Sequence, residues 1–320
     1  MEKQLEALLA EKPLLTKKPD YDEFWKDTLD RRLVYPLEPE LKPVQYPVKG
    51  IRVYDLSYNG FENRRVGGWF ILPEGASEKQ TVPALLYFSG YTWARGYVSQ
   101  YLSWALQGYA VLAMDNRGQG GPTPEYGRYT AGSMPGWFTK GIEDKSNYYY
   151  RGVFMDGIRA LDFLFSRPEI TKESVGLMGG SQGGATVLAV AGLDSRPAFA
   201  LCTFPFLCHV EKAFELASSH PYLELADYFK LFDPELKKKS AVFDTLSYYD
   251  GMNFASDITC PVLFAVGLKD TVCPPATTLA AYNHLKGEKE LVAYPLHGHE
   301  ELFPLDDRTF EFVSKYVKNK

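Results

Sequence analysis

Long apolar runs and an excess of basic residues are both missing from this sequence. Nowhere do about 18 apolar residues follow one another, so no transmembrane helix is expected. The net charge is −5 and the isoelectric point is about 5.7, which argues against nucleic acid or an anionic membrane surface as a partner. Internal repeats and low-complexity tracts are absent too. The 320 residues are 45% hydrophobic and 15% aromatic, which is ample for a large buried core.

Cysteine is scarce as well. The four cysteines, Cys202, Cys208, Cys260 and Cys273, have neither zinc-ribbon nor CxxC spacing. Cys202 and Cys260 lie in apolar, strand-like runs, which suits buried thiols in a reducing compartment. The chain opens with charged, helix-forming residues (MEKQLEALLAEK) rather than a secretory signal. A cytoplasmic location is therefore expected.

The length favours one domain, residues 1–320, over two. Strand-like apolar runs alternate with helical periods from residue 84 onward, and this pattern predicts an α/β fold with a mostly parallel sheet and helices on both faces. Before that point, two alternating runs at 49–58 and 67–73 predict a hairpin. The runs predicted as the remaining strands are 84–89, 110–114, 174–178, 198–204, 261–267 and 290–295.

Two segments lie outside this predicted core. Residues 1–45 are expected to be a helical extension that packs on the domain or on a neighbouring subunit. Residues 205–256 hold helical, polar and aromatic segments where a minimal fold needs one helix. This is the usual place for a cap, so a cap insertion is expected there.

The stretch Gly179-Gly180-Ser181-Gln182-Gly183 follows a predicted strand and precedes a small-residue run that can form a helix. G-x-S-x-G in this setting is the nucleophile elbow of α/β-hydrolases. The turn is so tight that a Cβ at position 179 or 183 would collide with the strand or the helix. Ser181 is therefore the candidate nucleophile, and the backbone N–H of Gln182 is a candidate oxyanion donor. The alternative is a glycine-rich turn that binds nothing.

Two further loops follow predicted strands at the same edge of the sheet. Tyr91 follows the strand at 84–89, where an α/β-hydrolase has its second oxyanion donor, so its backbone N–H is the candidate. An ordinary aromatic loop residue is the alternative. The loop at 115–121 (DNRGQGG) is not a phosphate-binding loop, because no Gly-Lys-Ser/Thr follows. Arg117 is expected to support this loop through carbonyls or a carboxylate rather than to contact substrate.

The order serine, aspartate, histidine along the chain is that of the α/β-hydrolase triad. Ser181, Asp270 and His299 each follow a predicted strand, so parallel neighbours would bring them to one sheet edge. Histidine is the side chain that can take the serine proton near neutral pH.

Other residues compete for the acid and base positions. Asp257 precedes its strand, which puts it at the wrong edge, and Asp115 follows a different strand from the one that the order predicts. Pattern alone does not separate His297 from His299. A metal site at His297–Glu300 (HGHE) would need a third ligand and lacks HExxH spacing, so no metal is expected.

Three motifs together resemble carbohydrate esterase family seven, the acetyl xylan esterases and cephalosporin-C deacetylases. They are Arg117-Gly118-Gln119, Gly179-Gly180-Ser181-Gln182-Gly183 and His299-Glu300, in this order, and the likeness extends to Glu23-Phe24-Trp25 and the total length. The resemblance implies a serine esterase of the α/β-hydrolase fold that removes acetyl groups from small alcohols. Acetylated xylo-oligosaccharides and cephalosporins are among the substrates it implies.

The same resemblance implies site residues and an assembly. Ser181, Asp270 and His299 would be the triad, with backbone donors at Tyr91 and Gln182. Arg117, Gln119 and Glu300 would support the site structurally. A cytoplasmic homohexamer without a cofactor is also implied.

Two other functions were open from the sequence. A serine peptidase of the prolyl-oligopeptidase kind shares the fold, but it usually has Trp-Ser-Tyr at the nucleophile where Gly180-Ser181-Gln182 stands here. A non-catalytic binding protein on a hydrolase scaffold normally lacks a triad member, whereas all three candidates are present. The esterase is the favoured function.

Overall fold

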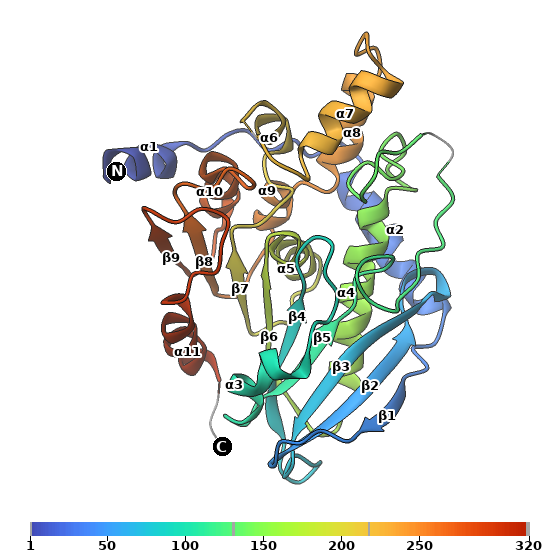
Figure 1. Ribbon diagram of the computed structural model, residues 1–320, viewed down its shortest axis with the longest axis vertical. Coiled ribbons are helices and arrows are strands. Elements are labelled where there is room, and N and C mark those ends of the chain that lie inside the picture. The colour runs from blue at the N-terminus through green and yellow to red at the C-terminus, as the bar shows by residue number, and fades with distance from the viewer. Residues whose placement is uncertain (1, 130–131, 217, 318–320) are drawn as a thin grey trace.

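A single twisted sheet runs through the protein in the computed structural model, which describes residues 2–129, 132–216 and 218–317 (Figure 1). Its strand order within these residues is β1-β2-β3-β5-β4-β6-β7-β8-β9. The strands are β1 (Glu40–Val44), β2 (Ile51–Asn59), β3 (Arg65–Pro73), β4 (Val82–Phe88), β5 (Ala110–Met114), β6 (Ile170–Gly180), β7 (Phe199–Thr203), β8 (Val262–Gly267) and β9 (Lys289–Tyr294).

The sheet is parallel from β5 to β9 and antiparallel at the other edge. Strands β2 and β3 form the predicted hairpin, and β3 pairs antiparallel with β5. The pairs β4–β5, β4–β6, β6–β7, β7–β8 and β8–β9 are all parallel. The predicted mostly parallel α/β sheet is therefore confirmed.

Strand β1 was not predicted. Residues 40–44, expected as the end of a helical extension, pair antiparallel with β2 and form the outer edge of the sheet. Their sequence, ELKPV, carries two charges and a proline, a composition that is depleted in strands. Proline has no N–H to donate to a neighbouring strand, and an edge strand tolerates this because it has a neighbour on one side only. Pro43 of β1 lies opposite Tyr54 of β2.

Helices cover both faces of the sheet (Figure 1). On one face, α4 and α5 pack against strand residues such as Leu86 of β4 and Leu112 of β5. On the other face, α3 and α11 pack against the adjacent strand residues Leu85 and Val111. The helices are α1 (Glu2–Ala10), α2 (Tyr21–Arg31), α3 (Leu102–Ala105), α4 (Tyr149–Ser166), α5 (Gln182–Leu193), α6 (Val210–Leu216), α7 (Leu223–Phe232), α8 (Lys239–Ser247), α9 (Gly251–Ala255), α10 (Pro275–His284) and α11 (Leu305–Tyr316).

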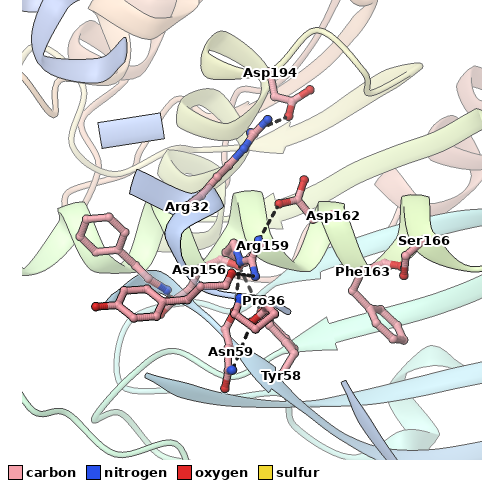
Figure 2. A network of polar contacts seen from close by, with 12 residues as sticks. Arg32, Pro36, Tyr58, Asn59, Asp156, Arg159, Asp162, Phe163, Ser166 and Asp194 are labelled. Atoms are coloured by element: carbon pink, nitrogen blue, oxygen red, sulfur yellow. Dashed lines mark hydrogen bonds and ion pairs between the residues drawn. The ribbon is translucent and has the colours of Figure 1, made fainter. Parts of the chain in front are cut away.

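The N-terminal segment is held against α4 by buried contacts. Trp25 of α2 is 2% exposed, and its indole N–H donates to the carbonyl of Tyr248 at 3.0 Å. Figure 2 shows the polar contacts that follow α2. The guanidinium of Arg159 on α4 donates to the carbonyl of Asn59 at 3.1 Å, and the Asn59 amide donates to the carbonyl of Pro36, also at 3.1 Å. The guanidinium of Arg151 on α4 also donates to the Thr28 hydroxyl of α2, at 3.1 and 2.8 Å, so α2, the hairpin and α4 form one packed unit.

Helices α6 to α9 lie between β7 and β8, in the segment predicted to be an insertion. Helices α6, α7 and α8 stand above the carboxyl ends of the central strands, while α9 packs beside α5 (Figure 1). This segment therefore lies over the edge of the sheet at which the candidate site residues were expected. Among the described residues, no helix has both the length and the apolar content that a membrane span requires.

Candidate active site

The turn between β6 and α5 has the strained backbone that the elbow motif predicts. Ser181 has φ 55° and ψ −120°, a conformation that L-residues rarely adopt. Backbone hydrogen bonds hold it on both sides: the Ser181 N–H donates to Thr203 at 3.0 Å, and the Ser181 carbonyl accepts from Phe206 at 2.9 Å. The strain is therefore stabilised by the neighbouring strand end.

The glycines of the elbow have the steric role expected of them. A Cβ on Gly179 would lie 2.6 Å from the carbonyl carbon and oxygen of Gly183. A Cβ on Gly183 would lie 2.1 Å from the carbonyl oxygen of Phe88, at the end of β4. Both contacts are with backbone atoms that cannot rotate away, so the elbow requires glycine at these positions.

Ser181, His299 and Asp270 meet above the ends of β6, β8 and β9. The Ser181 Oγ lies 3.0 Å from Nε2 of His299, and the other ring nitrogen, Nδ1, lies 2.7 Å from Oδ2 of Asp270. The second carboxylate oxygen of Asp270 accepts backbone N–H groups from Val272 and Cys273, each at 2.8 Å. The side chain of Asp270 is 1% exposed and its carboxylate is fixed by three hydrogen bonds, so it holds the imidazole in one orientation.

The competing acids and the competing base lie elsewhere. Asp115 is fully buried and accepts from the Arg95 backbone N–H at 3.0 Å and from the Thr123 hydroxyl at 3.1 Å. Asp257 pairs with Lys17 at the surface. The ring of His297 packs against Tyr294, with 5.3 Å between the ring centroids. Of the two histidines that pattern did not separate, His299 is the one whose ring contacts Ser181 and Asp270.

Gln182 and Gln119 hold the loop that contains Tyr91. The two buried side chains exchange hydrogen bonds of 2.9 and 3.1 Å. Gln182 also donates to the carbonyl of Gly90 at 3.3 Å, and Gln119 accepts the N–H of Thr92 at 2.8 Å. The chain is therefore held on each side of Tyr91. Gln182 itself begins α5, so its backbone N–H is in the first turn, where no intrahelical partner exists.

The carboxylate that Arg117 contacts is Asp156 of α4. The guanidinium makes two hydrogen bonds of 2.7 Å to it, and Asp156 also accepts the N–H of Phe61 at 2.8 Å. Glu300 lies at the surface, where its carboxylate accepts the N–H of Gly298 at 3.1 Å.

The sequence reasoning missed several side chains of the site. Two of them lie in the first turn of α4: Tyr149 accepts from Gln119 at 2.9 Å and Tyr150 donates to Gln182 at 2.8 Å. The thiol of Cys273 lies beside Ser181; burial raises its pKa well above the ordinary value, so it stays protonated and does not compete as a nucleophile. Within the described residues no group of three or more metal-ligating side chains is present.

Comparison with known proteins decides the family. Residues 1–316 match the family model described as acetyl xylan esterase. The chain belongs to the acetyl xylan esterase family. It is a carboxylic ester hydrolase, a serine esterase of the α/β-hydrolase fold that acts on acetylated substrates. The peptidase and the non-catalytic binding protein are thus set aside in favour of the esterase.

Two acetyl xylan esterases and an acetyl esterase are similar to this chain. The acetyl xylan esterase from Paenibacillus sp. R4 has 44% sequence identity and a TM-score of 0.96, covering 98% of this chain and 99% of that one. Acetyl xylan esterase 1 from Thermoanaerobacterium sp. JW/SL YS485 has 33% identity and a TM-score of 0.93, with the same coverage. Acetyl esterase Axe7A from Xylanibacter ruminicola (strain ATCC 19189) is 29% identical over 313 residues, which are 96% of this chain and 69% of that protein.

Two glycines of the elbow in this esterase, Gly183 and Gly180, should differ in their tolerance of substitution by alanine. Gly183→Ala places a methyl group 2.1 Å from a backbone oxygen. We expect it to lower the free energy of unfolding by about 3 kcal/mol or more and to remove activity. The matched control is Gly180→Ala, whose Cβ comes no closer than 3.3 Å to any neighbour, the Phe204 side chain, and which should remain close to the unaltered protein in stability. Urea unfolding followed by fluorescence measures both; equal losses would contradict the steric account.

Proposed function

We propose that Ser181 is the nucleophile of this esterase, His299 its general base and Asp270 the acid that orients the base. The observation that carries the proposal is the unbroken line of hydrogen-bonding distances, 2.7 Å from Asp270 to His299 and 3.0 Å from His299 to Ser181. With the proton of the neutral ring on Nδ1, Nε2 accepts the serine proton. A hydroxyl is a poor nucleophile until a base within this reach removes its proton.

In the proposed reaction the Ser181 oxygen attacks the carbonyl carbon of the acetyl ester while its proton passes to Nε2 of His299. The backbone N–H groups of Gln182 and Tyr91 stabilise the resulting oxyanion. Collapse of this intermediate transfers the proton from His299 to the leaving alcohol and leaves the acetyl group on Ser181. Water, activated by the same imidazole, then releases acetate and restores the serine.

Three residues support this machinery without touching the reacting atoms. Gln119 holds Thr92, next to the proposed donor, while Arg117 ties the end of β5 to α4 through Asp156. Glu300 accepts a backbone N–H one residue before His299 and so steadies the histidine loop. Their contacts support a role as positioning residues.

The proposed substrates are small acetylated esters, including acetylated xylo-oligosaccharides and cephalosporin C. Family membership and the names of the two similar acetyl xylan esterases support this class. Aromatic side chains also border the elbow: the backbone N–H of the buried Phe206 donates to the Ser181 carbonyl, and the ring centroid of Phe206 lies 6.3 Å from that of the half-buried Tyr91. Rings in this position leave more room for a short acyl group than for a long chain.

A cytoplasmic homohexamer is the proposed assembly. All four cysteines are free and buried, which suits a reducing compartment. The resemblance to carbohydrate esterase family seven supports the hexamer, as do three consecutive side chains, Leu33, Val34 and Tyr35, that are 75%, 66% and 43% exposed. Light scattering of the purified protein measures the mass of the assembly directly and so tests the proposed hexamer.

Removing the proposed nucleophile or base should abolish catalysis without unfolding the protein. For Ser181→Ala and for His299→Ala we expect kcat with p-nitrophenyl acetate to fall by roughly 10⁴-fold or more, because the members of a triad act as a unit. The matched control is His297→Ala, which removes a histidine two residues away that packs on Tyr294. It should keep most of the activity. A near-dead His297 variant beside an active His299 variant would reverse the choice of base.

The length of the acyl group should strongly affect the rate. We expect p-nitrophenyl acetate to be cleaved with a far higher kcat/KM than p-nitrophenyl octanoate, because the aromatic side chains beside Ser181 restrict a long chain. A substrate series of increasing acyl length, with the alcohol held constant, isolates this effect. Faster turnover of the octanoate would point to a lipase-like pocket instead.

A further inference from the structure

A buried carboxylate outside the triad lies next to the proposed oxyanion hole. Glu224, on α7, is 4% exposed. Its Oε1 accepts the hydroxyl proton of Tyr91 at 2.7 Å, and its Oε2 accepts the backbone N–H of Phe138 at 3.2 Å. None of the proposed catalytic steps uses this group. Carboxylates are rarely buried unless they are paired with a cation or serve the site, so its position calls for a function.

The Tyr91 hydroxyl is the junction at which three segments meet. Its oxygen accepts the backbone N–H groups of Trp137 at 2.5 Å and of Phe138 at 3.0 Å, so its own proton is directed to Glu224. The ring packs edge-on against Trp137, with 5.4 Å between centroids. The loop after β4, residues 137–138 and α7 are therefore joined through one hydroxyl and one carboxylate.

The backbone around Glu224 is shaped for a group of this size. Gly136 has φ 116°, and a Cβ there would lie 2.3 to 2.4 Å from the carboxylate atoms. Only glycine lets the chain turn this closely around the carboxylate. Both partners that hydrogen-bond to the carboxylate, an O–H and an N–H, are donors, and this is the arrangement that suits an ionised, acceptor-only group.

Tyr91, whose hydroxyl donates to Glu224, is also the residue whose backbone N–H is the proposed donor to the oxyanion. The main chain is held at Gly90 by Gln182 and at Thr92 by Gln119. Glu224 holds the side chain of the residue between them. We propose that Glu224 is a positioning residue of the oxyanion hole, which fixes the Tyr91 N–H in place by accepting the Tyr91 hydroxyl proton. The inference rests on the proposed role of Tyr91 in the esterase reaction.

The charge of Glu224 depends on pH in the range where the esterase reaction needs it. Burial raises its pKa from the ordinary 4.5 to about 7, against the lowering effect of Tyr91, Phe138 and Lys140. The titratable groups that face it are Tyr91, Lys140, and the phenols of Tyr148 and Tyr150 beside the start of α4. Below about pH 7 the carboxyl carries a proton that competes with one of its two donors.

The raised pKa also means that ionisation of Glu224 costs stability. The folded protein keeps a proton that the unfolded chain releases, so this group's contribution to stability is present below pH 4.5 and is lost as the pH rises through about 7. An uncharged side chain would avoid that loss. A carboxylate that the fold holds at this cost, next to the proposed donor, fits a role in the reaction.

Glu224→Gln tests the proposal, because glutamine keeps the shape and replaces one acceptor oxygen with a donor. With p-nitrophenyl acetate we expect kcat to fall about 10-fold near pH 8.5 with KM little changed, a fraction of the loss that follows removal of a whole oxyanion donor. Near pH 6, where the unaltered carboxyl is itself protonated, the ratio of the two kcat values should shrink to about two. A merely structural role would not produce this change with pH.

Matched variants separate the possible outcomes. Glu143→Gln alters another carboxylate that accepts a tyrosine hydroxyl from α7, that of Tyr228, and should leave kcat unchanged at both pH values. Tyr91→Phe keeps the backbone N–H and removes the hydroxyl, so it should reproduce the loss; it also supplies the measurement if Glu224→Gln does not fold.

The proposal is wrong if Glu224→Gln keeps its kcat within about twofold near pH 8.5, or if its loss is the same at both pH values. Ser181→Ala, assayed in parallel, distinguishes this failure from that of the proposed triad. An inactive Ser181 variant beside a fully active Glu224 variant removes only the positioning role. An active Ser181 variant removes the proposed triad and, with it, the basis for a positioning role.

Discussion

The strained turn at Ser181 is the constraint on which the rest of the site depends. Its backbone, at φ 55° and ψ −120°, is held by hydrogen bonds to Thr203 and Phe206 and by the close approach of Gly183 to the end of β4. Strain of this kind persists only where the surrounding structure over-determines it. The parallel sheet supplies that surrounding structure, because the ends of β4, β6 and β7 lie side by side. The same edge continues through the parallel pairs β7–β8 and β8–β9, so the loops after β8 and β9 bring the carboxylate and the imidazole within hydrogen-bonding distance of the hydroxyl.

A buried polar network connects the turn at Ser181 to the loop around Tyr91. Gln182 and Gln119 are paired with each other and with the loop main chain, and Tyr149 and Tyr150 complete their hydrogen bonds. Burying each of these polar groups costs desolvation free energy, and that cost is offset only when the group makes its hydrogen bonds within the network. The buried Arg117–Asp156 pair is weak evidence for stability on its own. Its value here lies in fixing where the loop after β5 meets α4.

Much of the fold and part of the site follow from local patterns in the sequence. The core strands were predictable because strands buried on both faces are short unbroken apolar runs, and the elbow because its glycines have a steric reason. Strand β1 was not, since its charges and Pro43 are tolerated only at a sheet edge. Pattern did not separate His299 from His297, because both lie in an irregular loop without period. Glu224 was missed because YLELADYFKLF predicts only an amphipathic helix, and its partner Tyr91 lies 133 residues away.

The central claim is that Ser181 forms a covalent bond with the acyl group in the course of the reaction. Trapping it with a p-nitrophenyl alkylphosphonate, followed by peptide mass mapping, tests this most directly, because the phosphonate bonds to an activated serine and does not leave. We expect one label per chain, on Ser181, with activity lost in proportion to labelling. Label on a different residue as activity disappears, or full activity with Ser181 labelled, would contradict it.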